Sequence, residues 1–278
     1  MKNNRIFYFI SLFAFSAFWA CSGSGDENQL IDDESVIQEI QLDDTKIPQQ
    51  FYQLPSPVEM FMFMWEDGAP FYNTHLNPIE NVDKYVDSKK KSLNLGIYSA
   101  DLAYCTVYDK NQETMNLFSA TKKLAEDLGL TEGFDQSILE RIDKNIENSD
   151  SLYRITSDSY SKTLTFLQSQ GRTEVLPYIV YGGWLESLYI ATQTVKKFNP
   201  ESGIAERIND QGLLLENLIE FFNAIKVSDA YADTILKDLN SLDLLFKKSA
   251  ESEDGLMTKE VYGEVKEQVK TLRNQIVK

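Results

Sequence analysis

Two acidic residues interrupt segments that are otherwise apolar, and they are the strongest candidates for chemistry in this chain. Asp101 lies within residues 95–108, and Glu186 lies within residues 178–191. Burying a carboxylate without a partner costs several kcal/mol, so each carboxyl must be hydrogen-bonded, paired, protonated or exposed to a water-filled pocket. Two neighbouring carboxyls can serve as acid and base, which makes the pair a candidate for glycoside hydrolysis in a solvent-connected cleft.

Two interpretations of this acidic pair are open. In the functional interpretation, the carboxyls face each other in an aromatic cavity that binds a sugar ring or another flat ligand. Six aromatic residues of the same two segments would form its walls: Tyr98, Tyr104, Tyr108, Tyr181, Trp184 and Tyr189. In the structural interpretation, which we favour, a tyrosine hydroxyl, a lysine or a helix N-terminus from a neighbouring element satisfies each carboxyl.

The other reactive side chains lack the partners that catalysis or metal binding needs. Cys105 has no CxxC partner, and His75 is the one histidine of the chain. We interpret Cys105 as a buried small apolar residue. One histidine and two cysteines do not make a zinc site, and no Gly-x-Ser-x-Gly elbow, Walker loop or dinucleotide fingerprint occurs. We therefore expect no enzymatic activity, no metal and no cofactor.

The charge balance argues against nucleic acid as a partner. The chain has 278 residues, with 27 Lys and Arg against 43 Asp and Glu, and its formal net charge is -16. Proteins that bind nucleic acid neutralise its phosphates with Lys and Arg, and this chain would instead be repelled.

The N-terminal residues are typical of a signal peptide. Lys2 and Arg5 precede an apolar run over residues 6–20. This run is too short for the ~20 residues that a transmembrane helix needs. It ends at Ala20-Cys21 and resembles a bacterial lipobox, with Phe18 and Trp19 in place of the usual leucine and small residue. The resemblance implies cleavage before Cys21, whose thiol would carry diacylglycerol and whose amine would carry a fatty acid such as palmitate.

The residues after Cys21 predict a tether. Eight acidic residues and the single base Lys46 lie between residues 22 and 50, so we expect a solvated segment that spans roughly 30 Å. The pair Asp26-Glu27 resembles the export signal of surface lipoproteins in Bacteroidetes-type bacteria. The predicted organisation is a signal peptide over 1–20, an acidic tether over 21–55 and a helical domain over 56–278. We expect lipid anchoring in the outer membrane. The sequence is compatible with a position on its surface face or on its periplasmic face.

Apolar residues from position 56 onward recur at spacings of three and four, which predicts an all-α domain of about ten helices. An antiparallel bundle or stacked helical hairpins would fit these lengths. The segments 95–108 and 176–198 are apolar on nearly every face and should be central, and Gly182-Gly183 should allow close helix contact. The other predicted helices cover 57–65, 81–92, 112–129, a segment from 135, 150–170, a segment with Ile208, Leu215, Ile219 and Phe222, 229–248, and a segment from 258. The last carries a stripe of Val261, Val265, Val269, Leu272 and Ile276.

One motif carries a family resemblance. The segment Asn94-Leu-Gly-Ile-Tyr-Ser-Ala-Asp-Leu-Ala-Tyr104 resembles a family of all-helical lipoproteins of Bacteroidetes-type bacteria. The resemblance implies an all-α fold and a surface or periplasmic location. It transfers no catalytic residue, because none is assigned in that family.

The sequence as a whole predicts a lipid-anchored outer-membrane lipoprotein that acts as a binding or scaffold module. Its partners would be the membrane, through the lipid, and a protein or a glycan. One alternative is a glycan-binding or nutrient-binding accessory lipoprotein with an open aromatic pocket. The other is an acid-based hydrolase that uses Asp101 and Glu186.

Overall fold

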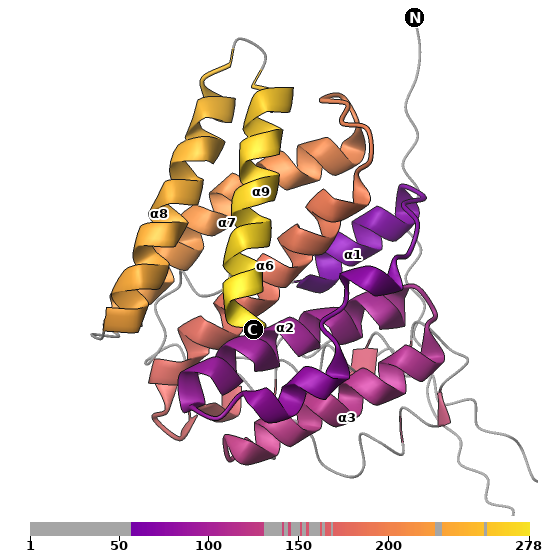
Figure 1. Ribbon diagram of the computed structural model, residues 1–278, viewed down its shortest axis with the longest axis vertical. Coiled ribbons are helices and arrows are strands. Elements are labelled where there is room, and N and C mark those ends of the chain that lie inside the picture. The colour runs from indigo at the N-terminus through magenta and orange to yellow at the C-terminus, as the bar shows by residue number, and fades with distance from the viewer. Residues whose placement is uncertain are drawn as a thin grey trace, which may run out of the picture. The chain divides into compact units, whose positions relative to one another are not determined.

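The computed structural model describes residues 57–130, 171–225, 230–252 and 255–278, together with single positions between 141 and 170. All regular structure in these ranges is helical and none of it is strand, which confirms the all-α prediction (Figure 1). The helices belong to one compact unit. They are α1 (Pro57–Glu66), η2 (Asn73–His75), η3 (Ile79–Lys84), α2 (Ser88–Val107), α3 (Asn111–Asp127), η4 (Thr173–Val175), α6 (Leu176–Thr194), α7 (Gly203–Ile225), α8 (Ala230–Ala250) and α9 (Lys259–Ile276), where η marks a 3-10 helix.

Helices α2 and α6 form the centre of the fold, as their apolar sequences predicted. Almost every residue of α6 is buried, as is almost every residue of α2 from Ser92 to Thr106, and the two backbones touch. A Cβ added at Gly96 would clash with the carbonyl oxygen of Ile179 and lie 2.7 Å from the amide nitrogen of Gly183. A Cβ added at Gly182 would clash with the carbonyl oxygen of Leu93. Glycine is therefore required where the two central helices cross.

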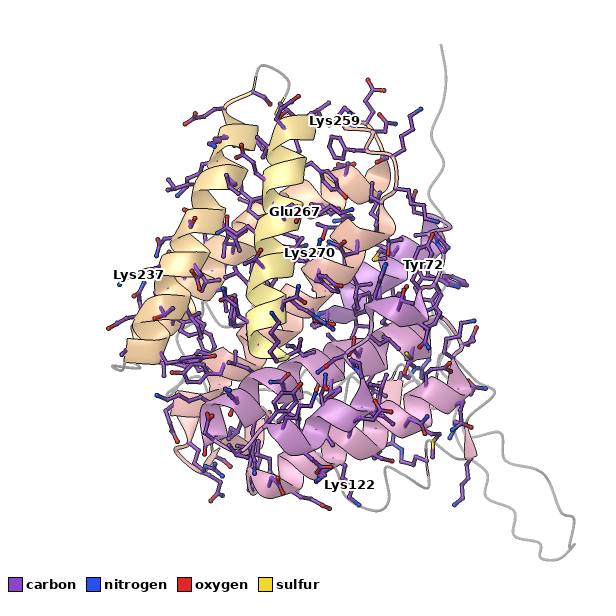
Figure 2. The ribbon with its side chains drawn as sticks, in the orientation of Figure 1. Tyr72, Lys122, Lys237, Lys259, Glu267 and Lys270 are labelled. Carbon is purple, nitrogen blue, oxygen red and sulfur yellow. The ribbon has the colours of Figure 1, made fainter. Side chains whose placement is uncertain are left out.

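The remaining helices cover this central pair. Helices α1 and α3 pack on α2, while α7 and α9 pack on α6, and α8 lies beside both α7 and α9 (Figure 1). The predicted stripe of α9 is buried at all five positions. Figure 2 shows Lys259, Glu267 and Lys270 along the outward face of the same helix. The spacing of the apolar residues therefore predicted correctly which face of α9 is buried.

The start of α2 corrects the sequence prediction. Two helices were predicted, over 81–92 and 95–108, with Asn81 as the cap of the first. The structure has a short 3-10 helix over residues 79–84, and α2 runs without a break from Ser88. Asp87 is the N-cap, and its side chain accepts a hydrogen bond from the Lys90 amide at 2.9 Å. Asn81 lies inside that 3-10 helix. Its Nδ2 donates to Asn77 at 2.8 Å and its Oδ1 accepts from Lys84 at 2.6 Å, so the oxygen that a cap would use is already engaged.

The end of α6 also differs from the prediction. The helix ends at Thr194 rather than near Phe198, and Val195 is extended. Leaving the helix early lets Phe198 stack on Tyr262 of α9, with ring centroids 4.3 Å apart. The side chain of Lys266 then donates to the carbonyl oxygen of Val195 at 3.4 Å. Contacts with α9 thus take the place of the last helical turn.

Several predictions fall outside the part of the chain that the structure describes. The signal peptide over 1–20, the tether over 21–55 and the helix from 135 lie there, as does most of the helix over 150–170. Among the described helices, none has the length and apolar character needed to cross a membrane.

Candidate functional site

The two predicted acids lie next to each other in the interior. Asp101 comes from α2 and Glu186 from α6, and both side chains are 0% exposed. The close crossing of the two helices at Gly96 and Gly182 brings them together. Two carboxyls in the core raise the question of what balances their charge.

Arg273 balances the charge of Glu186, and the sequence analysis did not identify it. Its Nε donates to Oε2 of Glu186 at 2.9 Å, and its Nη2 donates to Oε1 at 2.8 Å. This bidentate arrangement is the strongest geometry for an arginine and a carboxylate. Arg273 is only 6% exposed. Burial by itself lowers the pKa of Arg273, but the charge and hydrogen bonds of Glu186 outweigh burial and raise it.

Burial and the neighbouring Glu186 favour the neutral form of Asp101. Its Oδ2 accepts a hydrogen bond from the Asn77 amide at 2.9 Å, while Oδ1 accepts none. Burial raises the pKa of Asp101 well above its ordinary value, and the negative charge of Glu186 raises it further. Arg273 lowers this pKa by a smaller amount. When Oδ1 is protonated, it can donate a hydrogen bond toward Glu186.

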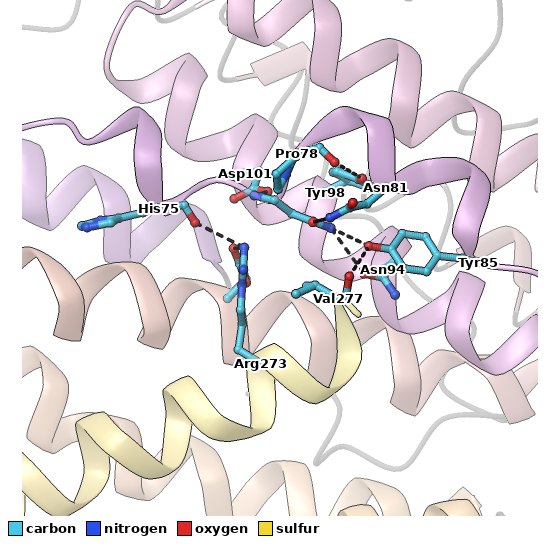
Figure 3. Close-up of polar contacts among 11 residues, drawn as sticks. His75, Pro78, Asn81, Tyr85, Asn94, Tyr98, Asp101, Arg273 and Val277 are labelled. Carbon is cyan, nitrogen blue, oxygen red and sulfur yellow. Dashed lines mark hydrogen bonds and ion pairs between the residues drawn. The ribbon is translucent and has the colours of Figure 1, made fainter.

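The cluster also fixes the segment that follows η2. Arg273 Nη2 donates to the carbonyl oxygen of His75 at 3.3 Å, while Asp101 binds the amide of Asn77 two residues later (Figure 3). Tyr98 donates its hydroxyl to the carbonyl oxygen of Pro78 at 2.8 Å. Three buried side chains from α2 and α9 therefore position the backbone of residues 75–78.

A polar network continues from Asn77 to the C-terminal end of α9 (Figure 3). Asn77 Nδ2 donates to the Tyr85 hydroxyl at 3.0 Å, and this hydroxyl donates to the carbonyl oxygen of Val277 at 3.3 Å. Asn94 Nδ2 donates to the carbonyl oxygen of Ile276 at 3.2 Å. The last carbonyls of a helix lack partners within the helix, and here buried side chains supply them.

The predicted aromatic residues of α2 face the segment before that helix. Tyr98 and Tyr104 are 0% exposed, and the Tyr104 hydroxyl accepts a hydrogen bond from the Tyr72 amide at 3.0 Å. Tyr108 is partly buried and packs edge-on against Tyr104, with ring centroids 4.8 Å apart. These three rings fill the space between α2 and residues 70–78.

The predicted aromatic residues of α6 face other neighbours. Trp184 is fully buried and donates its Nε1 to Gln211 of α7 at 3.1 Å. Tyr181 packs edge-on against Phe222, which also belongs to α7, with ring centroids 6.3 Å apart. Tyr189 instead lies under the guanidinium of Arg273, 4.7 Å from its ring centroid. The aromatic residues of α2 and α6 are thus packed core side chains on different faces and do not surround one common opening.

Cys105 and His75 have separate environments. Cys105 is fully buried, as its interpretation as a small apolar residue predicted, and burial raises the pKa of its thiol. His75 is partly buried beside Tyr72. Burial lowers the pKa of His75, as do the positive charges of Lys266 and Arg273. Neutral forms of both side chains are therefore favoured near pH 7.

A surface pocket of about 490 Å³ lies beside the cluster, and sequence reasoning missed it. One wall is the segment from Asn73 to Glu80, and the other is the first half of α3, from Gln112 to Leu117. Asn77 belongs to this pocket and also binds Asp101. Neither Asp101 nor Glu186 lines it. Across the described residues, no group of three or more His, Cys, Asp and Glu side chains is placed to hold a metal ion.

The chain was compared with protein-family models, with curated proteins and with solved structures. None of these comparisons gives a match.

Proposed function

We propose that the protein is a lipid-anchored lipoprotein of the outer membrane that acts as a binding or scaffold module and not as an enzyme. Its N-terminal sequence supports the anchor, because a basic start and an apolar run lead to Ala20-Cys21. The proposed lipid is attached at Cys21. The resemblance of residues 94–104 to helical lipoproteins supports the same assignment.

The proposal that the protein is not an enzyme rests on the burial and the hydrogen bonds of Asp101 and Glu186. A glycoside hydrolase must present two carboxyls to its substrate. Here Glu186 is engaged by Arg273 and Asp101 by the Asn77 amide, and neither acid has exposed surface. The bidentate contact of Arg273 with Glu186 and the hydrogen bond from the Asn77 amide to Asp101 support a structural role.

A second candidate is an accessory lipoprotein that binds a small nutrient. The pocket between residues 73–80 and α3 favours it, because its volume lies within the range of about 300–1,000 Å³ that is usual for small-ligand sites. This candidate differs from the sequence prediction in its location, since the predicted aromatic residues of α2 and α6 are packed in the core.

The proposed partners follow from charge and from the lipid. The protein would contact the membrane through its lipid, because cleavage removes Lys2 and Arg5 and leaves a chain with a formal charge of -18, which anionic headgroups repel. The acidic segment after Cys21 would separate the helical domain from the bilayer. The same charge makes nucleic acid an unfavourable partner.

Metabolic labelling with an alkyne fatty acid tests the anchor. The full chain should be labelled and should fractionate with the outer membrane, whereas Cys21→Ser should lose the label and stay unprocessed. Cys105→Ala is the matched control, because it removes the other cysteine and should keep the label. An unlabelled wild-type protein, or a labelled Cys21→Ser protein, would refute the proposal.

A further inference from the structure

The pocket beside the buried cluster has an apolar part and a polar part. Leu76 and Ile79 contribute apolar surface from one wall, and Leu117 contributes it from α3. The polar side chains include the amides of Asn73, Gln112 and Asn116. A ligand that fits this lining has a hydrocarbon body and hydrogen-bonding ends.

Among the described residues that line it, the pocket has two glutamates and no cationic side chain. Glu80 and Glu113 line it from opposite walls, and its lining includes no Lys, Arg or His. Neither glutamate forms an ion pair with another described residue. Asp83, one turn after Glu80 in η3, differs in this respect because it pairs with Lys123 of α3. Lys123 lies two helical turns beyond Asn116, so the protein bridges η3 and α3 with a lysine outside the pocket and leaves the pocket itself without one.

The wall formed by residues 73–80 is held in place from inside the protein. Asp101 binds the Asn77 amide, Arg273 binds the His75 carbonyl and Tyr98 binds the Pro78 carbonyl. These contacts are made by side chains that are at most 6% exposed. A pocket whose wall is fixed before binding loses little conformational entropy when a ligand enters.

We propose that this pocket binds a small organic cation, in which a primary amine is carried on a short hydrocarbon chain. The amine matches Glu80 and Glu113, and the hydrocarbon matches Leu76, Ile79 and Leu117. An anion would meet two carboxylates, and a stacked sugar would need an aromatic ring that the lining does not contain. This inference rests on the proposed binding role and names its ligand class.

Isothermal titration calorimetry of the purified full-length protein with three five-carbon probes tests the ligand class. The probes are 1,5-diaminopentane, pentane-1,5-diol and glutarate, which share a chain length and differ in the charge of their ends. The diamine should bind saturably at one site, and the diol and the dianion should not. Glu80→Gln and Glu113→Gln should each weaken diamine binding about tenfold or more, because each removes a charge-assisted hydrogen bond.

Glu220→Gln is the matched control, since it removes one negative charge from an exposed position of α7, outside the pocket. It should leave the affinity unchanged. An equal loss in Glu220→Gln, equal binding of the diol, or no saturable binding of the diamine would each overturn the inference. Circular dichroism of each variant verifies its fold. If the protein is labelled at Cys21 but does not bind the diamine, only this inference is refuted. If the protein binds the diamine but is not labelled, only the proposed lipid anchor is refuted.

Discussion

At the scale of single residues, Arg273 determines how the core tolerates an ionised acid. It neutralises Glu186 through two hydrogen bonds and also contacts the ring of Tyr189. Its position follows from the pattern of α9, because it lies four residues after Val269 and three before Ile276. Residues at these spacings share a helix face, so the stripe itself placed a charge toward the core. The sequence analysis treated only apolar members as buried and therefore missed it.

Replacing Arg273 with Met should strongly destabilise the protein, because Glu186 would stay buried without its cation. The expected loss is about 3–5 kcal/mol of unfolding free energy, measured by urea denaturation. Lys270→Met on the exposed face of the same helix is the control and should change stability by less than about 0.5 kcal/mol. Adding Glu186→Gln to Arg273→Met should recover part of the loss. Equal stability of the Arg273 and Lys270 variants would show that the buried pair is not structural.

Asp101 should make stability depend on pH. Its folded pKa is raised above the ordinary value of 3.8, so between these two values the native state keeps a proton that the unfolded state has lost. Stability from this group is therefore complete below the unfolded pKa and is lost as pH rises through the folded pKa. In this window the slope is about -1.4 kcal/mol per pH unit.

Asp101→Asn should remove this dependence, since an amide cannot ionise and can still donate toward Glu186. Relative to the wild type, the variant should therefore gain stability as pH rises from about 4 toward neutrality. Urea denaturation at a series of pH values measures the difference. Parallel stability curves for the two proteins would contradict a raised pKa at Asp101.

At the scale of elements, the local sequence pattern predicted the presence of the helices better than the residues at which they begin and end. Periodicity placed α9 and its buried stripe correctly, because one face must meet the core. The predicted start of α2 was wrong, because Asp87 caps this helix while Asn81 lies in η3 with its side-chain oxygen bound to Lys84. The pocket was not predicted because its walls, residues 73–80 and 112–117, meet only in the folded chain. No pattern within either segment records that meeting.

The crossing of α2 and α6 should not accept a methyl group. Gly96→Ala should cost about 1–3 kcal/mol or more, because the added Cβ would meet the backbone of α6. Gly263→Ala on α9 is the matched substitution, since a Cβ there would meet no atom within 4 Å apart from the local backbone of its own helix. It should raise stability by about 0.5–1 kcal/mol, as expected for a helix interior. Thermal or urea denaturation compares them, and a harmless Gly96→Ala would mean that the helices do not touch as described.

At the scale of the whole molecule, we propose that an acidic helical body is joined to a lipid anchor. The body uses its buried charges internally, and its open acidic pocket has no cation of its own. The proposed anchor rests on the first 21 residues of the sequence, which lie outside the described part of the chain. It stays a prediction from the apolar run and the Ala20-Cys21 junction, because a lipid anchor depends on local sequence rather than on packing.

Intact mass spectrometry of the protein extracted from membranes tests the central claim most directly. The account predicts a chain that begins at Cys21, lacks residues 1–20 and carries the added mass of a diacylglycerol and a fatty acyl group. A chain that still begins at Met1, or one that begins at an unmodified Cys21, would contradict it.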